Sequence, residues 1–374
     1  LRKNYNDPYS VTDNAIYTIC KDREGGVWAG TYFGGINYYP RQFTKFEKFF
    51  PQNQANSISG NAVREIVTDG RGNLIIGTED AGLNRMNPGN KVFDQFNVHN
   101  RNSNSNIHGL LVDNKKLWIG TFQHGIDVID LVSEKKIKHY DSRSHNLRSN
   151  FIYDLAKLKT GDILAATNQG IYKYQADKDD FVDFGNLPET FYTNIFQDSK
   201  GIIWIGSSVE GLFRYDPLST ELTNYKYNPD NKLSLADNHV TWIHEDRNNI
   251  IWVATESGLC RINENGEFTR FTTANGLPGN LIFAILEDRT GHLWISTSKG
   301  LADFDPESGK VKTYTKANGL ISDQFNYNSA FKDSSGQMYF GTVKGMVRFH
   351  PEKFIVNTYL PPVYITGLQL YDKE

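Results

Sequence analysis

A short pattern of apolar and small residues recurs eight times along the chain. Each copy is an apolar run that ends in a small residue followed by threonine or serine. The copies read VWAGT (27 to 31), LIIGT (74 to 78), LWIGT (117 to 121), ILAAT (163 to 167), IWIGS (203 to 207), IWVAT (251 to 255), LWIST (293 to 297) and MYFGT (338 to 342). Self-similarity at a period of roughly 45 residues is typical of repeat architectures.

Each unit also carries turn residues at fixed positions. Most units place an aspartate before the apolar phrase and a glycine between the two, as Asp198 and Gly201 do. An aspartate that opens a turn and a glycine that accepts positive φ are typical of hairpins. A second glycine follows every copy, and most units close with a spaced apolar pair such as Phe268 and Phe271. The pattern predicts four short strands per unit and no helices.

Four strands in every unit predict an all-β chain that forms the blades of a β-propeller. The last unit has no clear fourth strand after residue 351, whereas residues 1–5 resemble the end of one. We therefore expect residues 1–355 to form a ring of eight four-stranded blades that the N-terminal strand closes, because closure removes two exposed sheet edges. Seven blades in the ring, plus one that belongs to a neighbouring propeller, is the alternative.

The repeated tryptophans are predicted to be core residues. Aromatic residues make up 13% of the chain, which suits packing between blade faces. The residues expected to be buried are Trp28, Trp118, Trp204, Trp252 and Trp294. Trp242 lies outside the repeated phrase, on an expected innermost strand, and is the exception.

Composition excludes several classes of protein. The 374 residues carry a net charge of −3 with lysines and arginines dispersed, which gives no electrostatic footprint for nucleic acid. No apolar run approaches the ~20 residues that a membrane-spanning helix needs. The nine histidines and two cysteines show no metal-ligand spacing, and no nucleophile or phosphate-binding motif occurs. We therefore expect no catalytic residue, no metal and no cofactor in this region.

The combined motif resembles a known repeat. D-x-x-G-x-[LI]-W-[IV]-G-T followed by x-x-G-[LI]-x-x-[FY]-[DN]-P is similar to the two-component regulator propeller repeat, and the likeness covers residues 11–350. The tail PPVYITGL (361 to 368) resembles the start of the β-sandwich that follows the propellers in such sensors. Residues 356–374 are therefore expected to be an exit segment, and the chain is expected to be a fragment of a larger protein.

This resemblance implies a function. It implies a non-catalytic periplasmic sensor module, the extracytoplasmic part of an inner-membrane hybrid histidine kinase of the Bacteroidetes type. The implied ligand is an oligosaccharide. The implied partners are a neighbouring propeller and the β-sandwich of the same sensor, with a homodimer in the full-length protein. The alternative is a lyase resembling virginiamycin B lyase, whose propeller repeats also contain D-x-x-G-x-x-W.

Strand direction predicts which face binds a ligand. The loops after the repeated phrases and the connections into the innermost strands emerge on one face. Repeated asparagines at the start of these strands, such as Asn150 and Asn238, are interpreted as backbone caps. Residues that break the repeat are better functional candidates, because rings and hydrogen-bonding groups together suit carbohydrate. The candidate contacts are Tyr32, Phe33, Phe122, His124, His239 and Trp242, with Lys299 and Lys344 for an acidic glycan.

A smaller set is predicted near the channel mouth. These residues come from the expected innermost strands and either line a pocket or pack between blades. They are Arg64, Tyr153, His239, Trp242, Phe283 and Tyr327.

Overall fold

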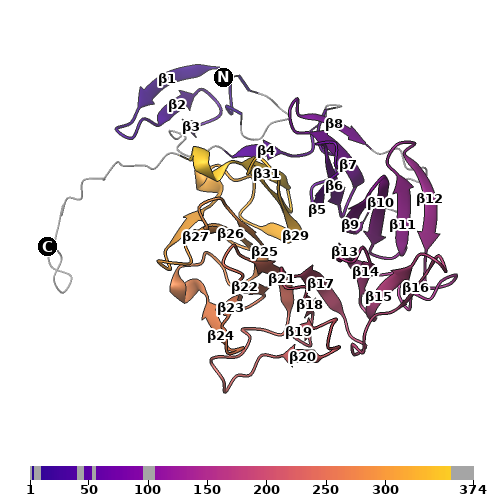
Figure 1. The fold of residues 1–374 in the computed structure, drawn as a ribbon. Helices are drawn as coiled ribbons and strands as arrows, with labels where there is room; N and C mark the ends of the chain where they lie inside the picture. The colour runs from indigo at the N-terminus through magenta and orange to yellow at the C-terminus, as the bar shows by residue number, and fades with distance from the viewer. Residues whose placement is uncertain (1, 4–9, 40–45, 53–55, 96–105, 355–374) are drawn as a thin grey trace. The chain divides into compact units, whose positions relative to one another are not determined.

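The computed structural model describes residues 2–3, 10–39, 46–52, 56–95 and 106–354 (Figure 1). Within this part the strands form eight antiparallel sheets, seven with four strands and one with three. The chain divides into two compact units, residues 1–45 with 352–374 and residues 46–351. The expected exit segment at 356–374 lies outside the described residues.

The seven four-stranded sheets belong to the larger unit, and in six of them the strands follow one another along the chain from the innermost to the outermost. The first sheet consists of β5 (Val63–Thr68), β6 (Leu74–Thr78), β7 (Gly82–Asn87) and β8 (Val92–Gln95), and the second of β9 (Ile107–Asp113), β10 (Lys116–Thr121), β11 (Ile126–Asp130) and β12 (Lys135–Tyr140). The third sheet consists of β13 (Ile152–Lys157), β14 (Ile163–Thr167), β15 (Gly170–Gln175) and β16 (Asp180–Asp183). The fourth consists of β17 (Tyr192–Gln197), β18 (Ile203–Ser207), β19 (Leu212–Tyr215) and β20 (Leu222–Tyr225). The fifth sheet consists of β21 (Val240–Glu245), β22 (Ile251–Thr255), β23 (Gly258–Ile262) and β24 (Phe268–Phe271). The sixth consists of β25 (Ile282–Glu287), β26 (Leu293–Thr297), β27 (Gly300–Phe304) and β28 (Val311–Tyr314). The seventh consists of β29 (Phe325–Lys332), β30 (Met338–Thr342), β31 (Gly345–Phe349) and β4 (Glu47–Phe49).

Three short 3-10 helices complete the described elements, η1 (Thr273–Asn275), η2 (Lys316–Asn318) and η3 (Pro351–Lys353). None of the helices in the described residues has the length and apolar character needed to cross a membrane.

The seven sheets form a closed ring. Their innermost strands are neighbours in one circuit, β5, β9, β13, β17, β21, β25, β29 and back to β5 (Figure 1). The all-β propeller is therefore confirmed. The eight-bladed ring is wrong, and the alternative of seven blades with a separate eighth sheet is the correct count.

The strand that closes the ring is β4. It pairs antiparallel with β31, with Phe49 opposite Met346. Phe46, just before β4, contacts the rings of Tyr314 and Phe349. The closing strand predicted at residues 1–5 is therefore wrong, because β4 occupies the outer side of β31. The repeat pattern assigns β4 to the first unit, but this segment completes the last blade instead.

The separate sheet has three strands, β1 (Ile16–Lys21), β2 (Val27–Thr31) and β3 (Ile36–Tyr39). Its apolar side chains are exposed, for example Tyr17 at 73% and Ile36 at 74%, because no second sheet covers it within the described part of its unit. Trp28 is 40% exposed, so its predicted burial is wrong.

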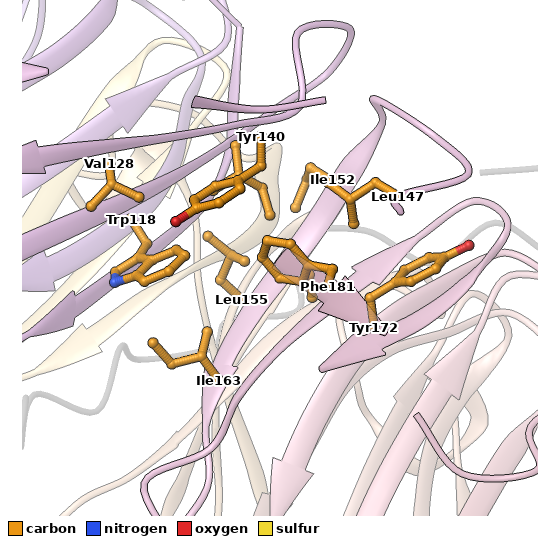
Figure 2. Close-up of a cluster of buried hydrophobic side chains, with 11 residues drawn as sticks. Trp118, Val128, Tyr140, Leu147, Ile152, Leu155, Ile163, Tyr172 and Phe181 are labelled. Carbon is orange, nitrogen blue, oxygen red and sulfur yellow. The ribbon is translucent and has the colours of Figure 1, made fainter. Parts of the chain in front are cut away.

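The other four repeated tryptophans are buried as predicted, at 6% exposure or less. They fill the spaces between neighbouring sheets. Figure 2 shows one such core, where Trp118, Val128 and Tyr140 of the β9–β12 sheet meet Leu155 and Phe181 of the next sheet.

The repeated aspartate has a direct role in holding the repeated tryptophan. In the β21–β24 sheet the indole N–H of Trp252 donates to Asp246 Oδ2 at 2.8 Å, while Asp246 Oδ1 accepts the backbone N–H of Ile250. The same indole-to-aspartate bond joins Trp28 to Asp22, Trp204 to Asp198 and Trp294 to Asp288. In each case the acid precedes the tryptophan by six residues, whereas Asp113 precedes Trp118 by five. The indole nitrogen of Trp118 is buried and finds no partner within the described residues.

The repeated asparagines are caps, as predicted. Asn238 Oδ1 accepts the backbone N–H of Tyr227, and its carbonyl oxygen accepts the N–H of Gly211 from the preceding sheet. Asn150 bonds in the same way to Ser142 and Gly125. These bonds fix each connection between blades and tie neighbouring sheets together.

The aspartate–tryptophan bond makes a stability prediction. We expect Asp246→Ala to lower the free energy of unfolding by about 3 kcal/mol, because it leaves the buried indole N–H and two turn N–H groups unsatisfied. Asp113→Ala is the matched control. Its carboxylate bonds to the partly exposed Lys157, so its loss should cost no more than about 1 kcal/mol. Equal losses in urea denaturation of the two variants would contradict the assignment.

Ring closure by β4 makes a second prediction. A chain that begins at residue 46 keeps β4 and should unfold at nearly the temperature of the whole chain. A chain that begins at residue 53 lacks β4 and exposes the edge of β31. We expect this second chain to melt at least about 10 °C lower or to aggregate. Thermal unfolding by circular dichroism measures both, and equal melting temperatures would show that β4 does not hold the ring closed.

Candidate functional site

The candidate site lies where loops and innermost strands meet on one face of the ring. In six of the seven blades, the first residue of the loop after the repeated phrase donates its N–H to the carbonyl oxygen of the residue that precedes the innermost strand. Glu79 bonds in this way to Ala62, and Glu256 to His239. The loops are thereby held over the starts of β5 and β21, so their side chains surround the ring axis.

A bulge recurs at the same place in the innermost strands. Six of these strands skip one residue when they pair with the second strand of their sheet, and the skipped residues are Arg64, His108, Tyr153, Thr193, Thr241 and Phe283. A bulge re-aims the side chain of the extra residue. The two threonines donate to the backbone of the next sheet, at Val240 and Ile282, and so tie the ring. The other four break this pattern.

All four pattern-breaking residues belong to one cluster that crosses the ring from non-adjacent sheets, in which the ring of His108 lies 5.6 Å from that of Tyr153. The guanidinium of Arg64 lies 4.6 Å from the ring centre of Tyr153 and 5.3 Å from that of Tyr327. Phe283 packs edge-on against Tyr327 at 4.7 Å. We call this group the axial cluster. It comprises Arg64, His108, Tyr153, Phe283 and Tyr327, together with the side chains around them, namely Glu65, Glu79, Phe122, Phe151, Asp154, Phe191, His239 and Glu256.

Arg64 is the buried charge at the centre of the axial cluster. It is 2% exposed, and its Nη1 lies 3.7 Å from Glu79 Oε1. Its Nε and Nη2 atoms are buried and have no hydrogen-bond partner in the part of the chain that the structure describes. Buried polar groups are normally paired with protein or with ordered water. Arg64 therefore offers donors to water or to a ligand.

Two acids and a histidine beside Arg64 have shifted pKa values. Burial, and then the charge of Asp154, raise the pKa of Glu65 well above its usual range. Burial also raises the pKa of Asp154 to about 6, although the N–H groups of Ile195 and Leu155 bond to it. Burial, reinforced by Arg64, lowers the pKa of His108 to about 3. His108 is thus neutral at neutral pH, and burial favours the protonated form of Glu65.

One half of the axial cluster is aromatic. Phe122 lies 4.6 Å from Phe151 and 5.4 Å from His108, and Phe151 lies 5.3 Å from Phe191. Phe122 is 38% exposed, whereas Tyr153 below it is buried. This half therefore presents apolar ring surface to a ligand.

The other half of the axial cluster is polar. Glu256 Oε1 accepts a hydrogen bond from the hydroxyl of Tyr327 at 3.0 Å and lies 3.2 Å from His239 Nδ1. His239 Nε2 is buried without a partner among the described residues. Burial lowers the pKa of His239, and the negative charge of Glu256 opposes this shift. The imidazole is thus held in one orientation by a carboxylate.

The structure separates the residues predicted as ligand contacts. Phe122 and His239 lie in opposite halves of the axial cluster. Trp242 packs partly against the core between its sheet and the next. His124, Lys299 and Lys344 are exposed in loops of three different sheets on the same face.

Tyr32 and Phe33 lie outside the ring. They follow β2 of the three-stranded sheet, where Tyr32 stacks on Tyr17 at 5.2 Å. Because that sheet belongs to the smaller unit, the expectation that these two residues share a face with the other candidates stays a prediction.

Five of the six residues predicted near the mouth come together, whereas Trp242 packs against the core between two sheets, and the pocket itself stays a prediction. Arg64, Tyr153, His239, Phe283 and Tyr327 are all members of the axial cluster. Other members of the site were not predicted from the sequence, namely Glu65, Asp154, His108, Phe151 and Phe191. His108 could have been found from its place in the repeat, because it stands at the same position of its innermost strand as Arg64 does.

Known proteins share this chain's repeats and fold. Four segments match the family described as two component regulator propeller, at residues 10–33, 186–208, 234–257 and 276–299. Histidine kinase P4 of Formosa agariphila is 38% identical over 86 residues, which are 21% of this chain and 6% of that protein. This chain therefore spans only a small part of that kinase.

Solved structures agree with the fold. The extracellular domain of the hybrid two component system BT3049 of B. thetaiotaomicron is 26% identical, with a TM-score of 0.81 over 100% of this chain and 50% of that one. Virginiamycin B lyase of Staphylococcus aureus is 16% identical, with a TM-score of 0.63 over 81% of this chain and 98% of that one, a likeness of fold alone. The family matches show that four segments of this chain are similar to two component regulator propeller repeats.

Proposed function

We propose that this chain is a propeller from the extracytoplasmic sensor of a hybrid two-component system and that it binds an oligosaccharide without changing it chemically. The family of the repeats and the likeness to the extracellular domain of BT3049 support the sensor role. The partial match to a histidine kinase supports a kinase elsewhere in the full-length protein. In that protein the sensor lies in the periplasm, attached to the inner membrane.

The observation that carries the ligand proposal is the two-sided chemistry of the axial cluster. Exposed ring surface at Phe122 faces the same side of the ring as the carboxylates of Glu79 and Glu256 and the imidazole of His239. Sugars present apolar C–H faces to aromatic rings and hydroxyl groups that both donate and accept hydrogen bonds. Lys299 and Lys344 on the surrounding loops add affinity when the glycan is acidic.

The sensor needs partners that transmit binding. We propose that the exposed faces of β1–β3 belong to the last blade of a neighbouring propeller, since this sheet carries the same repeat and leaves Tyr17, Ile19 and Ile36 exposed. Tyr32 and Phe33 then contribute to a ligand site on that propeller. A following β-sandwich and homodimerisation of the full-length protein carry the signal towards the kinase.

A lyase remains the alternative function. The geometric point in its favour is the carboxylate–imidazole pair of Glu256 and His239, which has the form of an oriented general base. The repeats and the sensor relatives favour binding over catalysis. Quinupristin is the compound bound in the S. aureus lyase structure. When this chain is incubated with quinupristin, we expect liquid chromatography to show that the compound is not converted. Conversion that His239→Ala abolishes would establish the alternative.

Calorimetry of the complete periplasmic region against defined oligosaccharides tests the binding proposal. For the glycan that binds, we expect Phe122→Ala and His239→Ala each to weaken affinity tenfold or more, through loss of ring stacking and of a hydrogen bond. Leu218→Ala is the control, because Leu218 is 94% exposed on the turn between β19 and β20, on the opposite face. Unchanged affinity in both folded variants would place the ligand elsewhere.

A further inference from the structure

One connection between blades differs from the others on the ligand face. Each of the other described connections buries one apolar side chain, five residues before the innermost strand begins, at 3% exposure or less. These residues are Ile58, Leu147, Leu235, Leu277 and Leu320. The connection between β16 and β17 places Leu187 at the equivalent point, and this residue is only partly buried. The space over β15 and β16 is therefore left open.

Two adjoining cavities occupy this space. Their volumes are about 300 and 540 Å³, and both cavities are open to solvent and lined mostly by polar surface. Both are lined by Arg148 and Asp183, so this pair forms the wall between them. Polar side chains on both sides face the cavities, from Ser142, His145, Asn146, Gln169, Asn186 and Glu189.

Arg148 has the geometry of a recognition residue. Its Nη2 lies 2.9 Å from Asp183 Oδ2 and its Nη1 lies 3.4 Å from Glu189 Oε2. The arginine side chain is 49% exposed and both carboxylates are 61% exposed. Ion pairs in such exposed positions contribute little to stability. Exchanging them for ligand hydroxyl groups therefore costs little.

The walls of the cavities are fixed in place. Asn146 bonds through its backbone and its side chain to Asp180 of β16. On the other side, the hydroxyl of Tyr192 donates to the carbonyl of Pro188 at 2.7 Å. A preformed site loses less conformational entropy when it binds a ligand.

We propose that these cavities form a second sugar subsite, where Arg148, Asp183 and Glu189 bind hydroxyl groups of a neutral sugar residue. Two carboxylates around a single arginine disfavour an acidic sugar. Arg148 precedes Phe151 of the axial cluster by three residues, so one glycan chain reaches both places. This inference rests on the proposed function, because it adds a subsite for the same ligand.

The test uses the complete periplasmic region and neutral gluco-, manno-, xylo- and arabino-oligosaccharides of two to six residues, with calorimetry as the measurement. For the series that binds, affinity of the unsubstituted protein should rise tenfold or more with chain length. Arg148→Ala should abolish this rise and leave disaccharide affinity unchanged. Arg148→Gln, whose side chain is larger than that of alanine, should have the same effect. Arg143→Ala, an exposed arginine of the same connection outside the cavity lining, is the matched control.

The outcomes separate the two proposals. Phe122→Ala should weaken binding of every chain length, whereas the Arg148 variants should affect only the longer chains. If folded Arg148 variants keep the full dependence on length, the second subsite is wrong while the proposed function stands. If no glycan in the series binds the unsubstituted protein and an acidic glycan does, the neutral subsite is also wrong. Failure to bind any oligosaccharide would overturn the proposed function itself.

Discussion

The pairing of β4 with β31 is the constraint on which the ring depends. It joins residues 47–49 to residues 346–348 and completes the last blade with a strand from the start of the unit. Closing so long a loop costs conformational entropy, and this cost is repaid only when every neighbouring pair of blades is in contact. The axial cluster also depends on closure, because Arg64 comes from the first blade of the ring and Tyr327 from the last. Both the fold and the site therefore rest on one three-residue strand.

The same repeat has different outcomes in the two units. Trp28 and Trp252 each donate an indole N–H to the aspartate six residues earlier. Trp252 is fully buried, whereas Trp28 is 40% exposed. The hydrogen bond is local and follows from spacing alone, but burial requires a neighbouring sheet on that face. A repeat motif thus predicts the turn and the indole contact more securely than it predicts the core.

This difference explains what the sequence could predict. The second strands, the turn aspartates and the asparagine caps depend on contacts within a few residues, and their positions were predicted correctly. The number of blades in the ring was not predicted correctly, because the first unit has the same spacing as the others and the sequence of the short strand β4 does not show which sheet it joins. At the site, Arg64 and Tyr327 were predicted near the channel mouth because they lie on the expected innermost strands. The cavities beside Arg148 were not, because they arise from the length of one connection and the incomplete burial of Leu187.

The polar residues on the ring axis weaken the fold in order to offer a site. Arg64 Nε and Nη2, Glu65 Oε2 and His108 Nδ1 are buried without partners in the described part of the chain. Threonines at the same bulge in other blades instead donate to the backbone of the next sheet, as Thr193 does. An unpaired buried donor or acceptor costs about 1–3 kcal/mol, so a ring selected only for stability would keep threonine at these positions. The low pKa of His108 keeps it neutral at pH 7, and the raised pKa of Glu65 shifts that carboxyl towards its neutral form, which reduces the charge that must be desolvated. The site thus combines unpaired buried donors and acceptors with the exposed ring of Phe122, and this combination matches the hydroxyl groups and apolar faces of a sugar better than it matches a simple ion.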